Sequence, residues 1–218
     1  LMLFKYLSKK KEEKPETGGI KNIIFDVGQV LVDYDWETYL DSFGFEPVKR
    51  ERIAKATFQS PVWDERDRGL YEEDVYLKQF QELDPEDAED IEKVIRGTGG
   101  TIHKRPYADT WVKYLKSKGY HLYILSNYAS YMIDHTKKEL TFRKEMDGEV
   151  FSCYVNQLKP EPEIYQTILD KYQLKPEESV FIDDRPENCQ GAQEQGIHTI
   201  CFKDFKQVTA DLEKLGVK

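Results

Sequence analysis

The chain has 218 residues, of which 39% are hydrophobic and 33% charged, and its formal net charge is -9. This length suits one medium domain or a core with a small insertion, and it is sufficient to bury a sizeable core. The acidic balance argues against a basic surface that binds a phosphate backbone, so nucleic acid is not expected as a partner. A small anionic substrate stays compatible with it, because a bound metal ion reverses the local field.

Three scattered cysteines, Cys153, Cys189 and Cys201, show no paired spacing. An odd number without a framework is typical of a reducing compartment, so we expect a cytoplasmic protein. No apolar run approaches the ~20 residues that span a membrane, and stable membrane insertion is not expected. The sequence leaves open whether the protein is a monomer or a homodimer.

Residues 1–19 are expected to form a flexible N-terminal tail. The first seven residues are apolar, and the basic run Lys9-Lys10-Lys11 follows them, which reverses the order of a signal peptide. The stretch up to Gly19 has the composition of a disordered linker. A weak interfacial anchor is the alternative for the apolar end.

The first predicted strand covers residues 22–26, an apolar run that ends at Asp26. Runs of this kind belong to parallel sheets that are covered on both faces. A carboxylate at the end of such a strand points into the crevice where open α/β sheets bind ligands. Alone, Asp26 suits a cap of the next segment equally well. A short extended segment, residues 30–35, leads away from this strand.

Residues 36–100 are expected to form a helical insertion. Apolar side chains recur at helical spacing through long charged segments, with prolines where helices can start. This pattern predicts four or five helices and no strand. Three glycines mark the return of the chain to the main domain: Gly97, Gly99 and Gly100.

The main domain is expected to comprise residues 20–35 and 101–218, where helices and strands alternate. Predicted helices cover residues 107–118, 161–172, 186–195 and 209–215, and a charged helical stretch runs to about residue 144. Predicted strands cover residues 121–125, 149–153, 179–182 and 197–202. Strands separated by helices imply right-handed crossovers and a parallel sheet. The expected fold class is α/β, with a Rossmann-like three-layer core and an inserted helical domain.

Polar residues follow three of the predicted strands: Asp26, Ser126-Asn127 and Asp183-Asp184. Lys159 precedes a predicted helix. Because the carboxyl ends of parallel strands share one edge of a sheet, these residues can meet there. Carboxylates gathered at one edge need a cation between them, and hard oxygen ligands favour Mg²⁺.

The same set of side chains suits phosphoryl transfer. A lysine offers a point charge to phosphate oxygens, and hydroxyl and amide groups offer hydrogen bonds. A carboxylate that attacks phosphorus forms an aspartyl-phosphate. Each feature also has a plain structural interpretation: Ser126-Asn127 suits a helix N-cap, Asp183-Asp184 a helix start, and Lys159 a solvated loop. The joint pattern favours the catalytic interpretation.

Together these motifs resemble those of the haloacid dehalogenase (HAD) superfamily, from about residue 21 to the C-terminus. The helical insertion resembles the C1-type cap of that superfamily. The first motif, with Asp33 and Asp35 after it, is most similar to the bacterial branch that includes α-D-glucose-1-phosphate phosphatase. The matching stretches are Phe25-Asp26-Val27-Gly28-Gln29-Val30-Leu31, Leu125-Ser126-Asn127, Lys159-Pro160-Glu161, Phe181-Ile182-Asp183-Asp184 and, in the cap, Trp63-Asp64-Glu65-Arg66-Asp67-Arg68-Gly69-Leu70.

The resemblance implies a Mg²⁺-dependent phosphomonoesterase that hydrolyses a small phosphorylated metabolite, such as glucose 1-phosphate, through an aspartyl-phosphate. Asp26 is expected to be the nucleophile and Lys159 its partner, which also contacts the phosphoryl group. Ser126 and Asn127 are expected to bind phosphoryl oxygens. The expected Mg²⁺ ligands are Asp26, the Gly28 carbonyl and Asp184, with Asp183 as a ligand or beside one.

One position departs from the usual pattern of these phosphatases. Most have a second aspartate two residues after the nucleophile as general acid and base, and this chain has Gly28 there. The glucose-1-phosphatase branch shares the glycine, so the change does not by itself imply inactivity. Candidates to replace the acid are Asp33, Asp35 and a metal-bound water.

Two other functions stay open. A catalytically weak or non-enzymatic binding or regulatory protein is the alternative that Gly28 supports. Dehalogenation of a small acid also uses an aspartate nucleophile, but it does not need Mg²⁺, so Asp183-Asp184 weighs against it. Candidate supporting residues are Trp36 and Trp63 on the substrate side, Arg66 and Arg68 as substrate contacts or helix ion pairs, and Arg185 and Asn188 at the metal loop.

Overall fold

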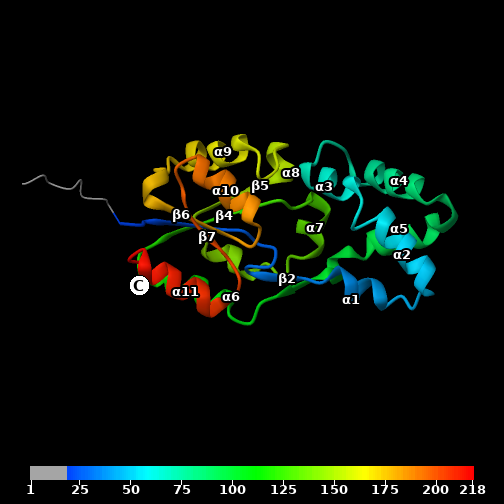
Figure 1. Ribbon diagram of the computed structural model, residues 1–218, viewed down its shortest axis with the longest axis horizontal. Helices are drawn as coiled ribbons and strands as arrows, with labels where there is room; N and C mark the ends of the chain where they lie inside the picture. Colours follow the sequence, from blue (N-terminus) through cyan, green and yellow to red (C-terminus); the bar gives the residue numbers. More distant parts are fainter. Residues whose placement is uncertain (1–18) are drawn as a thin grey trace, which may run out of the picture.

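The computed structural model describes residues 19–218 (Figure 1). The predicted tail, apart from Gly19, therefore lies outside the described residues. A five-stranded sheet forms the centre of the larger part of the molecule, with strand order β5-β4-β1-β6-β7 and all pairs parallel. The strands are β1 (Asn22–Phe25), β4 (His121–Ser126), β5 (Gly148–Phe151), β6 (Ser179–Asp183) and β7 (His198–Cys201).

Helices cover both faces of this sheet, because successive side chains of a strand point to opposite sides. Ile23 and Phe25 of β1 belong to a core with α6 (Ala108–Ser117) and α11 (Phe205–Lys214). Ile24 belongs to a second core with α9 (Pro162–Tyr172) and α10 (Pro186–Glu194). The predicted three-layer α/β fold is thus confirmed.

The chain between Tyr34 and Ile102 makes an excursion of five α-helices, at the right of Figure 1. They pack around an apolar cluster of their own that includes Leu40, Ile53 and Phe80. The antiparallel pair β2 (Val32–Tyr34) and β3 (Ile102–Lys104) joins them to the rest. The helices are α1 (Trp36–Asp41), α2 (Pro47–Ala56), α3 (Pro61–Arg68), α4 (Glu73–Leu83) and α5 (Ala88–Arg96).

Three segments differ from the sequence-based prediction. β3 was not expected, because three residues carry little pattern and form a strand only by pairing with β2. The strand predicted over residues 149–153 ends at Phe151, and the short helix α8 (Ser152–Val155) follows it. The last helix begins at Phe205, because the Asp204 side chain accepts a hydrogen bond from the Gln207 amide and caps it.

The predicted charged helical stretch up to residue 144 consists of α7 (Ser130–His135) and a 3₁₀ turn over Thr141–Glu145. None of the helices between residues 19 and 218 has both the length and the apolar character needed to cross a membrane.

Candidate active site

The polar strand ends meet at the carboxyl edge of the sheet. Asp26 follows β1, the central strand, and its amide donates to the Ile182 carbonyl of β6. Side-chain oxygens of Asp26, Asp183 and Asp184 all lie within 4.8 Å of one another. More than 150 residues separate Asp26 from Asp183 and Asp184 in the sequence, and the parallel pairing of β1 with β6 brings them together.

Asp26 is almost buried, and three groups stabilise its Oδ1 atom. The Val27 amide donates to it at 2.7 Å, the Ser126 hydroxyl at 2.8 Å, and the Lys159 ammonium lies 2.9 Å away. Burial nevertheless raises the pKa of Asp26 to about 7, because desolvation outweighs the opposing attraction of Lys159.

Lys159 is 4% exposed and lies between two carboxylates. Its Nζ atom is 2.6 Å from Asp183 Oδ2 in addition to its contact with Asp26. Burial disfavours the charged ammonium, but Asp183 and Asp26 outweigh it and raise the Lys159 pKa. The lysine is therefore a fixed cation in the site. It is not exposed to solvent, as the alternative interpretation of a loop lysine required.

Asp183 is fully buried, and both of its carboxylate oxygens have donors. The Arg185 amide and the Asn188 side chain donate to Oδ1 at 2.8 and 3.0 Å, and Lys159 contacts Oδ2. The predicted supporting role of Asn188 thus corresponds to a direct contact. Asp183 is held in a position where it orients Lys159.

Asp184 is only partly buried, and no side chain within residues 19–218 donates a hydrogen bond to its carboxylate. Burial and the nearby Asp183 raise the Asp184 pKa. Three carboxylates and one ammonium leave an excess of negative charge in a desolvated space. Hard oxygen donors with such an excess fit a divalent cation, and Mg²⁺ prefers ligands of this kind.

The Asn127 side chain connects two loops of the site. Its amide nitrogen donates to the Lys159 carbonyl at 3.0 Å, and its oxygen accepts from the Lys159 amide at 2.8 Å. These two bonds join the loop after β4 to the loop that carries the lysine. The Asn127 side chain borders the cavity, but both its polar ends serve this connection.

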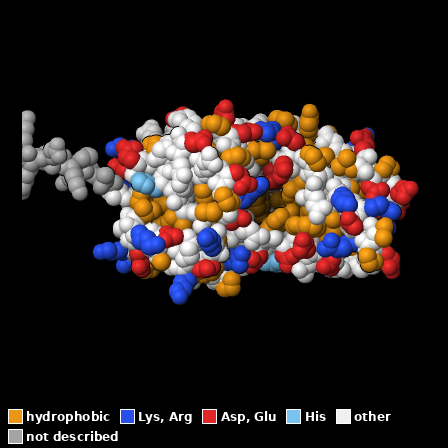
Figure 2. Space-filling view, in the orientation of Figure 1, with side chains coloured by type: hydrophobic (Ala, Val, Ile, Leu, Met, Phe, Trp, Pro, Cys, Tyr) orange, Lys and Arg blue, Asp and Glu red, His pale blue; other side chains and the backbone are white. Residues whose placement is uncertain are grey.

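A cavity of about 290 Å³ opens above these groups, between the sheet edge and the five helices. Figure 2 shows the hollow between the two parts of the molecule, with hydrophobic side chains on its walls. Asp26, Gly28, Asn127, Lys159 and Asp184 line its floor. Aromatic and apolar side chains make up a large part of its walls: Tyr34, Trp36, Phe58, Trp63, Ile102, Tyr128 and Met132.

Asp67 on α3 also lines this cavity, and the sequence analysis did not single it out. The only signal was its place in the stretch that resembles the C1-type cap. The Ser152 hydroxyl donates to the Asp67 carbonyl at 2.5 Å, which holds this turn of α3 against α8. Burial raises the pKa of the Asp67 carboxyl to about 7.

The other charged candidates are engaged elsewhere. Asp33 lies 2.8 Å from Arg105, and Asp35 caps α1 through a 3.0 Å bond from the Thr38 amide. The Arg66 guanidinium donates twice to Glu73, and Arg68 donates twice to Glu161. Both arginines therefore form ion pairs, which was one of the two roles expected for them.

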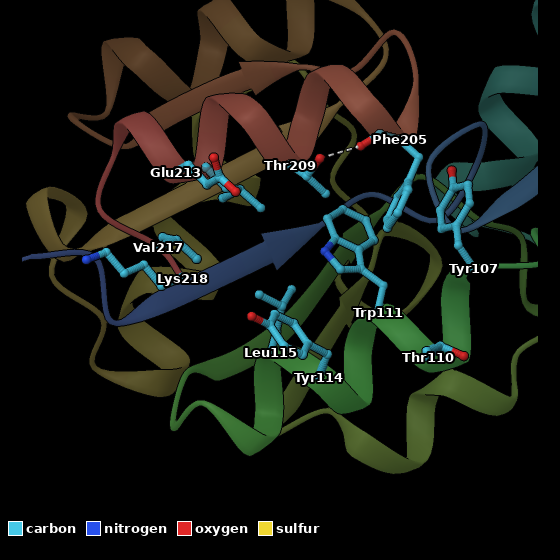
Figure 3. Close-up of a pocket in the computed structure, with 11 residues that line it drawn as sticks. Tyr107, Thr110, Trp111, Tyr114, Leu115, Phe205, Thr209, Glu213, Val217 and Lys218 are labelled. Carbon is cyan, nitrogen blue, oxygen red and sulfur yellow. Dashed lines mark hydrogen bonds between the residues drawn. The ribbon is translucent and has the colours of Figure 1, made fainter.

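A larger cavity of about 770 Å³ lies between α6 and α11 (Figure 3). The rings of Trp111 and Phe205 face it, with centroids 5.3 Å apart. Glu213 and Lys218 are the charged residues on its wall. It lacks the acidic cluster of the sheet edge, so we place the chemistry in the smaller cavity.

A comparison with known protein families finds a match that includes all the residues of this site. A family model described as "Hydrolase: haloacid dehalogenase-like hydrolase" matches residues 20–196. Over 107 residues, 46% of this chain, the sequence is 34% identical to bifunctional epoxide hydrolase 2 of Rattus norvegicus, and the match covers only 19% of that protein.

Longer matches come at lower identity. Flavin mononucleotide hydrolase 1 of Arabidopsis thaliana is 26% identical over 89% of this chain and 77% of its own length. A HAD family enzyme from Bacteroides thetaiotaomicron, solved in complex with magnesium and inorganic phosphate, superposes with a TM-score of 0.69. That structure is 23% identical and covers 87% of this chain and 99% of its own, so it shows the shared fold.

Proposed function

The chain belongs to the haloacid dehalogenase-like hydrolase family, and from this premise we propose that it is a Mg²⁺-dependent phosphomonoesterase that acts through an aspartyl-phosphate. The observation that carries the proposal is the buried contact of Lys159 with Asp26 and Asp183, beside a third carboxylate, Asp184. A positively charged group and a nucleophilic carboxylate at one point are what phosphoryl transfer requires.

In the proposed reaction, one oxygen of the Asp26 carboxylate attacks phosphorus. Lys159 holds Asp26 in place and attracts the phosphoryl oxygens, and the Ser126 hydroxyl fixes the orientation of the carboxylate. The aromatic walls exclude bulk water, which strengthens these electrostatic interactions. The five helices would serve as the cap over the substrate.

Asp26, Asp184 and the carbonyl of Gly28 are the proposed Mg²⁺ ligands. A bound Mg²⁺ would offset the charge of the phosphoryl oxygens and of the carboxylates. Asp183 is the proposed support for this site, because its oxygens already accept bonds from Lys159, Asn188 and the Arg185 amide. The magnesium and phosphate in the Bacteroides thetaiotaomicron enzyme support the proposal.

The proposed substrate is a small phosphorylated metabolite with a single phosphoryl group. The cations that line the cavity are Lys159, which two carboxylates hold, and Arg185, which lies 2.8 Å from Glu187. A second anionic group would therefore find little compensation. Glucose 1-phosphate remains the specific proposal, because the apolar face of a sugar ring can pack against the aromatic wall of the cavity, and flat rings such as that of FMN suit the same wall.

A phosphate-release assay tests the proposal. We expect the wild-type protein to release phosphate from sugar phosphates or FMN with Mg²⁺, and release should stop when EDTA removes the metal. Asp26→Asn should abolish release, because it replaces the attacking carboxylate with an amide that is not nucleophilic. Substrates with two phosphoryl groups should be poorer than their monophosphate counterparts.

Asp170→Asn, an exposed carboxylate on α9, is the matched control and should keep wild-type activity. Release that persists in Asp26→Asn, or in EDTA, would contradict the proposed mechanism. A wild-type protein that binds phosphate esters without releasing phosphate would support the binding or regulatory alternative.

A further inference from the structure

The residue two positions after Asp26 is Gly28, which has no side chain to exchange a proton with the leaving group. The sequence pointed to Asp33 and Asp35 as replacements. Neither borders the cavity: Asp33 is paired with Arg105, and Asp35 caps α1. Of the three candidates named from the sequence, a metal-bound water is left, and a side chain that donates the proton has to come from another part of the chain.

Four carboxylates line the cavity within the described part of the chain: Asp26, Asp64, Asp67 and Asp184. Asp26 and Asp184 belong to the proposed nucleophile and metal site. Asp64 is exposed on α3, whereas Asp67, one turn further along, is partly buried. The Ala129 amide lies close enough to the Asp67 carboxyl to oppose the rise of its pKa. This places the group beside the segment that follows β4 and begins at Asn127.

The surroundings of Asp67 favour its protonated form. Burial raises its pKa to about 7, Arg66 opposes this, and the charges of Asp64 and Asp26 add to it. An acid with a pKa near the working pH can both give and take a proton. The charged and titratable groups that face it are Arg66 and Asp64 on α3, Asp26 after β1, Tyr34 on β2, Tyr128 before α7 and Cys153 on α8.

Resting on the proposed phosphatase function, we propose that Asp67, on helix α3 of the insertion, is the general acid and base of the reaction. In the first step, a bond forms between Asp26 and phosphorus, the bond from phosphorus to the ester oxygen breaks, and Asp67 protonates that oxygen. In the second step, a bond forms between the water oxygen and phosphorus, the Asp67 carboxylate takes a proton from that water, and the bond from Asp26 to phosphorus breaks. Alcohol and inorganic phosphate leave, and both carboxyl groups return to their initial states.

Asp67→Asn keeps the shape of the protonated side chain and removes its transferable proton. We expect kcat/KM for glycerol 1-phosphate, an alkyl ester with a poor leaving group, to fall by roughly 10²–10⁴-fold. For p-nitrophenyl phosphate the fall should be small, because nitrophenolate leaves without a proton. A burst of nitrophenolate should also appear, because hydrolysis of the aspartyl-phosphate loses its base.

The pH profile separates this role from a structural one. Wild-type kcat/KM for glycerol 1-phosphate should decline above about pH 7, as Asp67 loses its proton, and Asp67→Asn should lack this decline. The wild-type protein supplies an independent test without any substitution. Its kcat/KM should depend more steeply on the leaving group at pH 9 than at pH 6.

Asp170→Asn on α9 and Asp33→Asn on β2 are the matched controls, and both should keep the wild-type ratio between the two esters. Equal losses on both esters in Asp67→Asn, or an alkaline decline that persists, would overturn the proposal. Loss of the alkaline decline in Asp33→Asn would also overturn the proposal. If the wild-type protein hydrolyses neither ester, the proposed function fails; if it hydrolyses both and Asp67→Asn leaves their ratio unchanged, only this inference fails.

Discussion

Lys159 decides the electrostatic balance of the site. It is a buried cation with two carboxylates in contact, at 2.9 Å from Asp26 and 2.6 Å from Asp183. Desolvation of all three groups is costly, and their mutual attraction offsets that cost only while the lysine is present. Without it, two buried carboxylates would face each other with no compensating charge.

Lys159→Met should therefore lower the free energy of unfolding at pH 8 by about 3–5 kcal/mol, the usual cost of leaving a buried charge unpaired. The pKa of Asp26 is about 7 in the folded protein, above its ordinary value of 3.8, so its ionisation destabilises the fold as pH rises through that interval. Without the lysine, the destabilisation by ionised Asp26 is larger. The loss of unfolding free energy in Lys159→Met should thus be smaller at pH 5.5 than at pH 8, as measured by urea unfolding in EDTA.

Lys138→Met provides the comparison, since Lys138 is exposed. Its effect should stay within about 0.5 kcal/mol at both pH values. Equal losses for Lys159→Met at pH 5.5 and pH 8 would show that the pairing with Asp26 does not govern the stability of the site.

Helix α3 connects the insertion to the main part of the protein. Its last residue, Arg68, donates twice to Glu161, at 2.7 and 3.0 Å. The next residue, Gly69, has a φ of +71° and lies so close to α8 that a Cβ would meet the Cys153 carbonyl oxygen at 2.7 Å. This approach requires glycine, and it determines where Asp67 lies above the sheet edge.

Gly69→Ala should destabilise the protein and displace Asp67. The left-handed backbone costs about 1–2 kcal/mol for alanine, and the clash with α8 should add about 1–3 kcal/mol. Hydrolysis of poor leaving groups should fall more than hydrolysis of p-nitrophenyl phosphate, since Asp67 would move with the end of α3.

Gly44→Ala is the matched control, because Gly44 has a φ of +67° and no atom within 4 Å of its Cβ position. It should show the backbone cost alone and unchanged activity. If the two variants lose the same stability and keep the same activity, the close approach of α3 to α8 does not position Asp67.

At the scale of the whole molecule, the site lies where the sheet edge faces the five helices. The floor of the cavity belongs to one part and most of its aromatic wall to the other. The carboxylates of Asp26, Asp183 and Asp184 repel one another in a desolvated space, which is a cost to the folded state. A cation that binds only the folded chain would remove that cost and stabilise the protein by mass action.

Mg²⁺ should accordingly raise the Tm of the wild-type protein. At a concentration of 100 times its Kd, the linkage corresponds to about 2.7 kcal/mol, or roughly 5–10 °C for a chain of this size. Asp184→Asn should lose most of this shift, and Glu82→Gln, an exposed site on α4, should keep it. A wild-type Tm that is the same in Mg²⁺ and in EDTA would count against the metal site.

Much of the fold was predictable because it depends on local patterns. The buried run before Asp26 and the helices between later strands led to a parallel sheet, and its order β5-β4-β1-β6-β7 puts β1 at the centre. α8 and β3 were missed, since both depend on partners far along the chain. Ser152 of α8 donates to Asp67, and β3 pairs with β2.

The sequence by itself determined that Asp26, Asp183 and Asp184 would gather at one edge, because parallel strands expose their carboxyl ends on the same side. Lys159 lies in a turn before α9, and its place beside them was expected from the resemblance to the family's motifs. Only the tertiary structure decided that Asn127 holds the Lys159 loop, that Asp33 and Asp35 turn away, and that Asp67 borders the cavity. The physical reason is the distance along the chain over which each interaction acts. Strand periodicity and crossover handedness act within neighbouring segments, whereas the position of α3 results from its contacts with α8 and Glu161, about 85 to 95 residues away along the chain.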